Sequence, residues 1–204
     1  MDALREHLRS SARALRDVFH NRSLRHLQLA WAGSIIGSWA YTVALVVFAY
    51  GHGGATAVGL VGVIRWLPAA VASPFAAILG DRYSRVRVML AADLVRAAGL
   101  AVMAVVVLSD GPVALVYLLA SGVAVTTTAF QPAQAALLPS LARTPEELTA
   151  ANVSSSTLES LGFCVGPALG GLLLAVSSVW VVFAVTAGLF LWSALMLLYW
   201  ACTR

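Results

Sequence analysis

Long stretches of this chain carry no acidic or basic side chain. Residues 26–64, 111–142 and 160–203 contain no Asp, Glu, Lys or Arg. A helix needs about 20 apolar residues to cross a bilayer, and irregular backbone cannot face lipid because its polar groups would lack partners. The pattern therefore predicts six membrane-spanning helices, at roughly 27–50, 55–79, 88–108, 113–138, 147–176 and 179–200.

The composition leads to the same class of protein. Of 204 residues, 60% are hydrophobic and 11% are charged, whereas soluble domains are about half apolar and a quarter charged. A soluble chain of this composition would expose large apolar patches. We therefore expect an all-α, polytopic membrane protein with residues 23–204 in the bundle. Residues 1–22 are expected to form a basic amphipathic segment on the cytoplasmic surface of the bilayer.

The positions of the basic residues predict how the chain is oriented. All 13 are arginine, and eleven fall on one side of the membrane if the predicted helices alternate. The opposite loops, 51–54, 109–111 and 177–178, contain none. This asymmetry predicts cytoplasmic termini in the cell membrane, and it accounts for the basic charge without a nucleic-acid partner. The eleven are Arg5, Arg9, Arg13, Arg16, Arg22, Arg25, Arg82, Arg85, Arg87, Arg143 and Arg204.

The other two arginines lie inside predicted helices. A charge at the centre of a bilayer costs about 3 kcal/mol on insertion scales, so it should face the bundle interior or water. Arg65 is therefore either a functional charge or half of a buried ion pair, and the sequence does not choose. Arg96 follows Asp93 by three residues, a spacing that favours a local ion pair on one helix face.

The predicted helix 147–176 carries a stripe that changes from polar to small. Asn152, Glu159, Gly166 and Gly170 lie within ~40° of one another around a helix. Glu159 is ~18 Å from the helix start, near the bilayer midplane. Desolvation disfavours the charged form of a carboxylate, a property that a proton-coupled carrier needs. A structural ion pair is the alternative.

Two glutamines in the predicted helix 113–138 complete the polar positions. Gln131 and Gln134 flank Pro132, which suits either interhelical hydrogen bonds or a wet cavity. The candidate proton or substrate site thus comprises Glu159, Arg65, Asp93, Arg96, Asn152, Gln131 and Gln134.

The segment between the second and third predicted helices, AILGDRYSRVR at 77–87, resembles the signature loop of the major facilitator superfamily, G-x-L-A-D-R-x-G-R-K. In that family the loop acid latches the N-terminal half to a helix of the C-terminal half, which the resemblance implies for Asp81. The matching residues are Leu79, Asp81, Arg82 and Arg85; the departures are Ala77, Ser84 and Val86.

A second resemblance lies in the predicted helix 147–176. Gly162, Gly166, Pro167, Gly170 and Gly171 match the G-x-x-x-G-P-x-x-G-G motif of exporters in the same superfamily. This resemblance implies close helix packing along the glycines. Pro139, Glu147-Leu148 and Ala151-Asn152 further resemble bacterial exporters related to the enterobactin exporter.

The resemblance implies two inverted three-helix repeats that form half of a twelve-helix fold. It implies secondary active transport, with efflux of a small molecule, by a half-length or truncated chain. The missing half would be a second six-helix chain or another copy of this one. Arg65 and Glu159 are then expected on different seams of the bundle. The alternative is a six-helix substrate-binding subunit of an importer.

The sequence offers no candidate for catalysis. It contains no HExxH or GxSxG motif, no paired carboxylates on one helix and no phosphate-binding loop, so metal, serine and nucleotide chemistry lack ligands. We expect no enzyme activity, cofactor or metal. The expected partners are the lipid bilayer and a small-molecule substrate.

Overall fold

The computed structural model describes residues 21–202, apart from the side chains of 75–81. Most of the predicted amphipathic segment, 1–20, therefore lies outside the described residues. The secondary structure of the described part is entirely helical, and each helix is long and apolar enough to cross a membrane. The helices are α2 (Arg22–Arg82), α3 (Arg85–Leu108), α4 (Val113–Leu141), α5 (Pro145–Val176) and α6 (Val179–Cys202).

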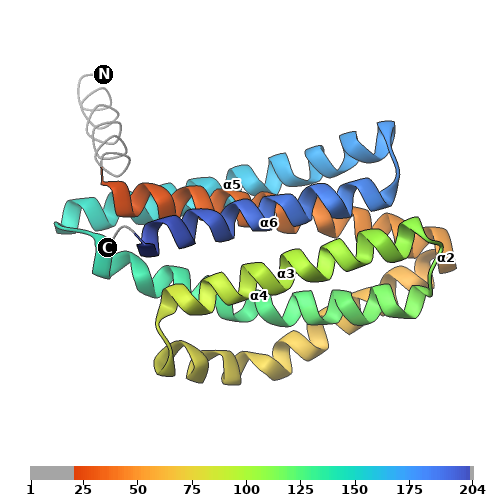
Figure 1. Cartoon of the computed structure of the whole chain (residues 1–204), viewed down its shortest axis with the longest axis horizontal. Coiled ribbons are helices and arrows are strands. Elements are labelled where there is room, and N and C mark those ends of the chain that lie inside the picture. Colours follow the sequence, from red (N-terminus) through yellow and green to blue (C-terminus); the bar gives the residue numbers. More distant parts are fainter. Residues whose placement is uncertain (1–20, 203–204) are drawn as a thin grey trace, which may run out of the picture.

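Helix α2 contains a break that reverses the chain. Gly53 and Gly54 have non-helical backbone angles, and Gly54 has a φ of 61°, a conformation that glycine adopts without a steric cost. Figure 1 shows α2 running along the bundle, turning, and running back. We call residues 22–52 the first arm and residues 55–82 the second arm. They correspond to the predicted helices 27–50 and 55–79, with a shorter connection than expected.

The helices pack into one bundle around a central polar layer. Helix α2 packs against α4, α5 and α6, while α3 packs against α4 and α6. One apolar cluster includes Leu45, Leu100 and Phe183. A second cluster, closer to the ends that contain the chain termini, includes Leu27 and Leu138. The buried residues Ser34, Asp93, Arg96 and Ser193 lie between the two clusters along their helices and form this polar layer.

The contact between α5 and the first arm of α2 is made through glycines. A Cβ added at Gly166 would lie 2.5 Å from the Trp39 Cβ and 2.9 Å from the Ile36 carbonyl oxygen. A Cβ at Gly162 or Gly170 would also come close to the first arm, at 2.6 Å from the Ile35 side chain and 2.9 Å from the Ala40 carbonyl oxygen, whereas a Cβ at Gly171 would meet nothing within 4 Å. Three of the four predicted packing glycines thus lie in this contact. Gly171 points away from it because it is offset by 100° from Gly170.

Hydrogen bonds at the start of α5 fix the turn after α4. The Thr144 hydroxyl accepts a hydrogen bond from the Glu147 N–H at 3.1 Å, while the Glu147 carboxylate accepts one from the Arg143 N–H at 2.6 Å. The other carboxylate oxygen accepts a hydrogen bond from the Asn21 side chain at 2.8 Å. Glu147 therefore joins the helix cap to the start of α2.

Replacing Thr144 with alanine is expected to lower the free energy of unfolding by about 1 kcal/mol, because the first turn of α5 loses its side-chain cap. Denaturant titration in mixed micelles, followed by tryptophan fluorescence, measures this change. Thr149→Ala, which removes an exposed hydroxyl that bonds only within its own helix, is the matched control. A loss for Thr149→Ala equal to that for Thr144→Ala would contradict the capping role.

Candidate functional site: a central cavity beside a buried ion pair

A cavity of about 400 Å³ lies among α2, α3, α4 and α5. Both arms of α2 contribute to its wall, and aromatic side chains make up much of the lining. Four of the seven residues of the predicted proton or substrate site line the cavity, namely Arg65, Arg96, Gln131 and Glu159. The lining residues are Trp31, Ser34, Ile35, Ser38, Trp39, Tyr41, Thr42, Arg65, Trp66, Arg96, Thr127, Phe130, Gln131 and Glu159.

Glu159 supplies the carboxylate of this cavity. Its side chain is exposed, and its Oε1 accepts a hydrogen bond from Gln131 Nε2 at 3.4 Å. Among the described residues, Asp93 and Arg96 form an ion pair. No cationic nitrogen of these residues lies within 4.0 Å of the Glu159 carboxylate. Glu159 therefore remains available to a proton or to a ligand.

Arg65 reaches the same cavity from the second arm. Its Nη2 donates to the Thr42 hydroxyl at 3.2 Å, and its guanidinium carbon lies 5.2 Å from the centre of the Tyr41 ring. The Arg65 Nε and the Tyr41 hydroxyl are buried atoms without a hydrogen-bond partner among the described residues. A carboxylate or another strong acceptor in the cavity would satisfy these donors.

The cavity brings together two residues that the sequence analysis considered separately. Arg65 and Glu159 both line it, while their expected position on different seams of the bundle stays a prediction. Both α5 and the second arm flank the first arm, so side chains from either one reach the space beside it. The two do not form an ion pair in the described structure.

The predicted pair of Asp93 and Arg96 is confirmed. Arg96 Nη2 lies 2.8 Å from Asp93 Oδ1, and the two side chains are 1% and 0% exposed. Arg96 Nη1 donates to the Ser34 hydroxyl at 3.0 Å, and the Ser193 hydroxyl donates to Asp93 Oδ2. The pair thus connects α3 to the first arm and to α6. Hydrogen bonds of this kind offset part of the cost of burying two charges.

Two aromatic rings enclose the Arg96 guanidinium. Its central carbon lies 4.4 Å from the centre of the Phe130 ring and 4.7 Å from that of Phe190. Both distances fall within the range of cation–π attraction. Arg96 is therefore a compensated charge at the edge of the cavity, in contrast to Arg65.

The remaining two residues of the predicted site lie elsewhere. Gln134 donates to the Ser155 hydroxyl at 3.2 Å, which also accepts from Gln28 at 2.9 Å. Trp31 donates to the Ser155 carbonyl at 3.3 Å. Asn152 is exposed and does not line the cavity. Gln134 thus belongs to a network centred on Ser155, a residue that the sequence analysis did not single out.

The loop before α3 is described only in part. Arg85 Nη1 donates to the Ala136 carbonyl oxygen at 2.7 Å, which connects the start of α3 to α4. Arg82 is exposed. The Asp81 side chain lies outside the described residues, so its expected role as a latch stays a prediction. Among the side chains that the structure describes, which do not include 75–81, no group of three or more His, Cys, Asp or Glu could hold a metal ion.

Comparisons with known proteins identify relatives of this chain. The model of the Major Facilitator Superfamily matches residues 28–203. Macrolide efflux protein A of Streptococcus pyogenes is 32% identical over 177 residues, which cover 84% of this chain and 42% of that protein. The uncharacterized MFS-type transporter YfiS of Bacillus subtilis is 30% identical over 185 residues, or 89% and 43% of the two chains.

The alignments cover most of this chain but a smaller share of each relative. The chain spans less than half the length of the curated relatives it matches. No solved structure matches it.

Proposed function

Because this chain belongs to the major facilitator superfamily of membrane transporters, we propose that it forms one half of a secondary active transporter that exports a small molecule. The observation that carries this proposal is the central cavity, where a carboxylate and a guanidinium without ionic partners face one space. Charges inside a membrane protein are costly and tend to mark substrate or ion pathways. The macrolide efflux relative supports the outward direction.

Six membrane crossings in two inverted repeats fit the packing of the helices. Suppose that the first arm, the second arm and α3 form one repeat, and that α4, α5 and α6 form the other. Each helix contact then has a counterpart when the two repeats are interchanged. The first arm packs on α5 and α6, and α4 packs on α2 and α3. The α3–α6 contact maps onto itself. Such symmetry is typical of transporters with inverted-topology repeats.

A cytoplasmic location of both termini fits the arrangement of the ends. Figure 1 shows both ends of α2, the α4–α5 turn and the end of α6 at one end of the bundle. These segments carry Arg22, Arg82 and Arg143. The opposite turns carry no arginine. This distribution supports insertion in the cell membrane with the arginine-bearing end inside.

In the proposed transporter, Glu159 exchanges a proton and Arg65 contacts the substrate. The aromatic wall would hold an apolar body, and Gln131 would orient the Glu159 carboxylate through its hydrogen bond. Alternating access requires a second bundle that moves against this one. The proposed partner is a second six-helix half or another copy of this chain, in a lipid bilayer.

Glu159→Gln is expected to reduce proton-driven efflux by about tenfold, because an amide cannot bind and release the coupling proton. The assay is uptake of a labelled macrolide into inverted membrane vesicles, with this chain produced together with a C-terminal six-helix half. Glu146→Gln is the matched control: Glu146 is an exposed residue in the first turn of α5 and lies outside the cavity.

Unchanged efflux for Glu159→Gln would remove Glu159 from the proposed mechanism. Co-purification of a second six-helix chain, or of a second copy, tests the requirement for two bundles. Tight macrolide binding by the chain alone, without transport in either combination, would instead favour the substrate-binding subunit of an importer.

A further inference from the structure

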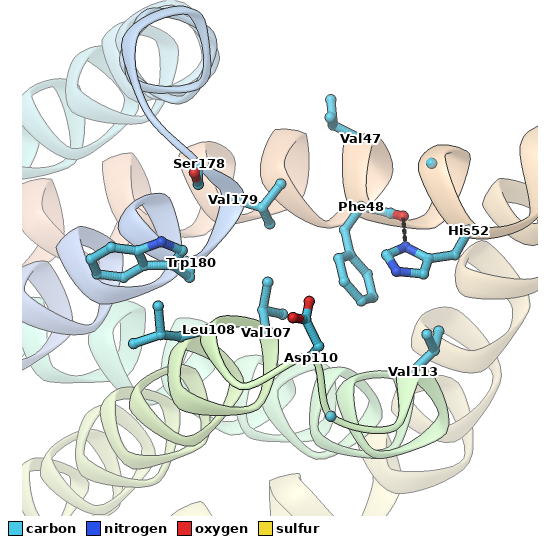
Figure 2. A pocket seen from close by; sticks show the side chains of 12 residues that line it. Val47, Phe48, His52, Val107, Leu108, Asp110, Val113, Ser178, Val179 and Trp180 are labelled. Atoms are coloured by element: carbon cyan, nitrogen blue, oxygen red, sulfur yellow. Dashed lines mark hydrogen bonds between the residues drawn. The ribbon is translucent and has the colours of Figure 1, made fainter.

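A second pocket, of about 670 Å³, opens at the end of the bundle that lacks arginine. It lies among the end of the first arm, the α3–α4 turn and the start of α6, as Figure 2 shows. Its lining includes Phe48, His52, Asp110 and Trp180. It shares no lining residue with the central cavity.

Asp110 provides the one carboxylate of this pocket. The backbone of its turn is held by hydrogen bonds, from the Asp110 N–H to the Val107 carbonyl at 3.3 Å and from the Gly111 N–H to the Val106 carbonyl at 2.8 Å. In Figure 2 the carboxylate points toward the middle of the pocket. No hydrogen bond or ion pair of this side chain occurs within the described part of the chain. The hydrogen-bonded turn thus presents an exposed carboxylate that has no partner among the described residues.

His52 adds a second acceptor. Its Nδ1 lies 2.8 Å from the Phe48 carbonyl oxygen, which only accepts hydrogen bonds, so Nδ1 must carry a proton. In the neutral form of this tautomer, Nε2 is unprotonated and is an acceptor. The His52 ring also packs on the Phe48 ring, with centroids 4.2 Å apart. Asp110, and His52 in this tautomer, thus offer lone pairs to the pocket; Ser178 is the third polar residue of the lining.

The rest of the wall selects an apolar ligand body. Phe48 and Trp180 supply aromatic faces, and valines from α2, α3, α4 and α6 contribute to the surface. No arginine is among the described residues of the lining. An anion would meet the Asp110 carboxylate without a compensating cation. A metal ion would find two protein ligands, fewer than the three or four that bound metals need.

From these features we propose that this pocket binds an amphipathic organic ammonium ion. The ammonium group donates charge-assisted hydrogen bonds to Asp110 and His52, while its apolar body packs against Phe48 and Trp180. The Trp180 ring also attracts a cation that approaches its face. Binding here does not require transport. In the proposed transporter the pocket is a site at the outer end, separate from the Glu159 cavity.

The test uses the purified full chain in phosphatidylcholine nanodiscs with dansylcadaverine, which has an aromatic body and a primary ammonium group. Energy transfer from tryptophan to the dansyl group reports binding, and Trp180→Phe removes the donor within the pocket. Asp110→Asn is expected to weaken binding roughly tenfold, because the ammonium loses its charged acceptor. Asparagine tolerates the φ of 50° at this position, so the turn is kept.

Two controls separate this site from other sources of binding. Dansylamide, which lacks the ammonium group, is expected to bind Asp110→Asn and the unaltered chain equally. Glu146→Gln removes a carboxylate from the opposite end of the bundle and is expected to leave the dissociation constant unchanged. Equal dissociation constants for dansylcadaverine with and without Asp110→Asn would overturn the proposal. So would a loss of binding in Glu159→Gln, since the amine would then occupy the central cavity.

Discussion

Asp93→Asn is expected to lower the free energy of unfolding by about 3–5 kcal/mol, because it leaves the buried Arg96 guanidinium without its counter-charge. Arg96 is 1% exposed and lies 2.8 Å from the carboxylate, so the variant leaves a buried charge with only the Ser34 hydroxyl and the Ala92 carbonyl as acceptors among the described residues. Arg96→Met should cost a similar amount by leaving the Asp93 carboxylate unpaired. Denaturant titration in mixed micelles, followed by tryptophan fluorescence, measures both losses.

The double variant Asp93→Asn with Arg96→Met tests whether the loss of stability in each single variant comes from the charge that is left unpaired. Removing both charges relieves the unpaired charge, so the double variant should recover most of the stability that either single variant loses. Ser193 can donate to the new amide oxygen as it does to the carboxylate. Arg87→Met, on an exposed residue of α3, is the control for losing an arginine. Losses that simply add in the double variant would show that the two charges are not coupled.

Gly166→Ala is expected to destabilise the bundle by about 1–3 kcal/mol, through overpacking of a close helix contact. The new Cβ would lie 2.9 Å from the Ile36 carbonyl oxygen. Backbone cannot swing aside as the end of a flexible side chain can, so α5 and the first arm must separate. A longer side chain, as in Gly166→Leu, should increase the loss. The same micelle titration measures these variants.

Gly171→Ala is the matched control on the same helix. A Cβ at Gly171 meets nothing within 4 Å, and alanine has a higher helix propensity than glycine. This variant should therefore be as stable as the unaltered chain or slightly more so. If Gly166→Ala behaved in the same way, the close α5–α2 contact would not exist in the membrane protein.

The sequence predicts those parts of the fold that depend on one helix at a time. Apolar stretches located the helices, and the spacing of Asp93 and Arg96 identified their ion pair because both residues lie on α3. It did not identify Ser34 and Ser193 as partners of that pair. They come from other helices, and their contact depends on how each helix is rotated in the bundle.

The central cavity illustrates the same limit. Arg65 and Glu159 were both singled out as costly charges in a membrane, but one sequence gives no distance between the second arm and α5. The position of the α2 break was also approximate. Helical backbone angles continue past the expected end of the first helix to His52, and only Gly53 and Gly54 depart from them.

The glycine contact between α5 and the first arm also affects how these two helices can move. Where Gly162, Gly166 and Gly170 face the first arm, α5 presents backbone rather than protruding side chains. The Ile35 and Trp39 side chains of the first arm occupy the spaces that Gly162 and Gly166 leave, so sliding of α5 along its own axis would bring larger residues against them. Rotation about that axis would turn larger neighbours such as Phe163, which is exposed, into the narrow gap. The contact thus opposes both sliding and rotation of α5 against the first arm.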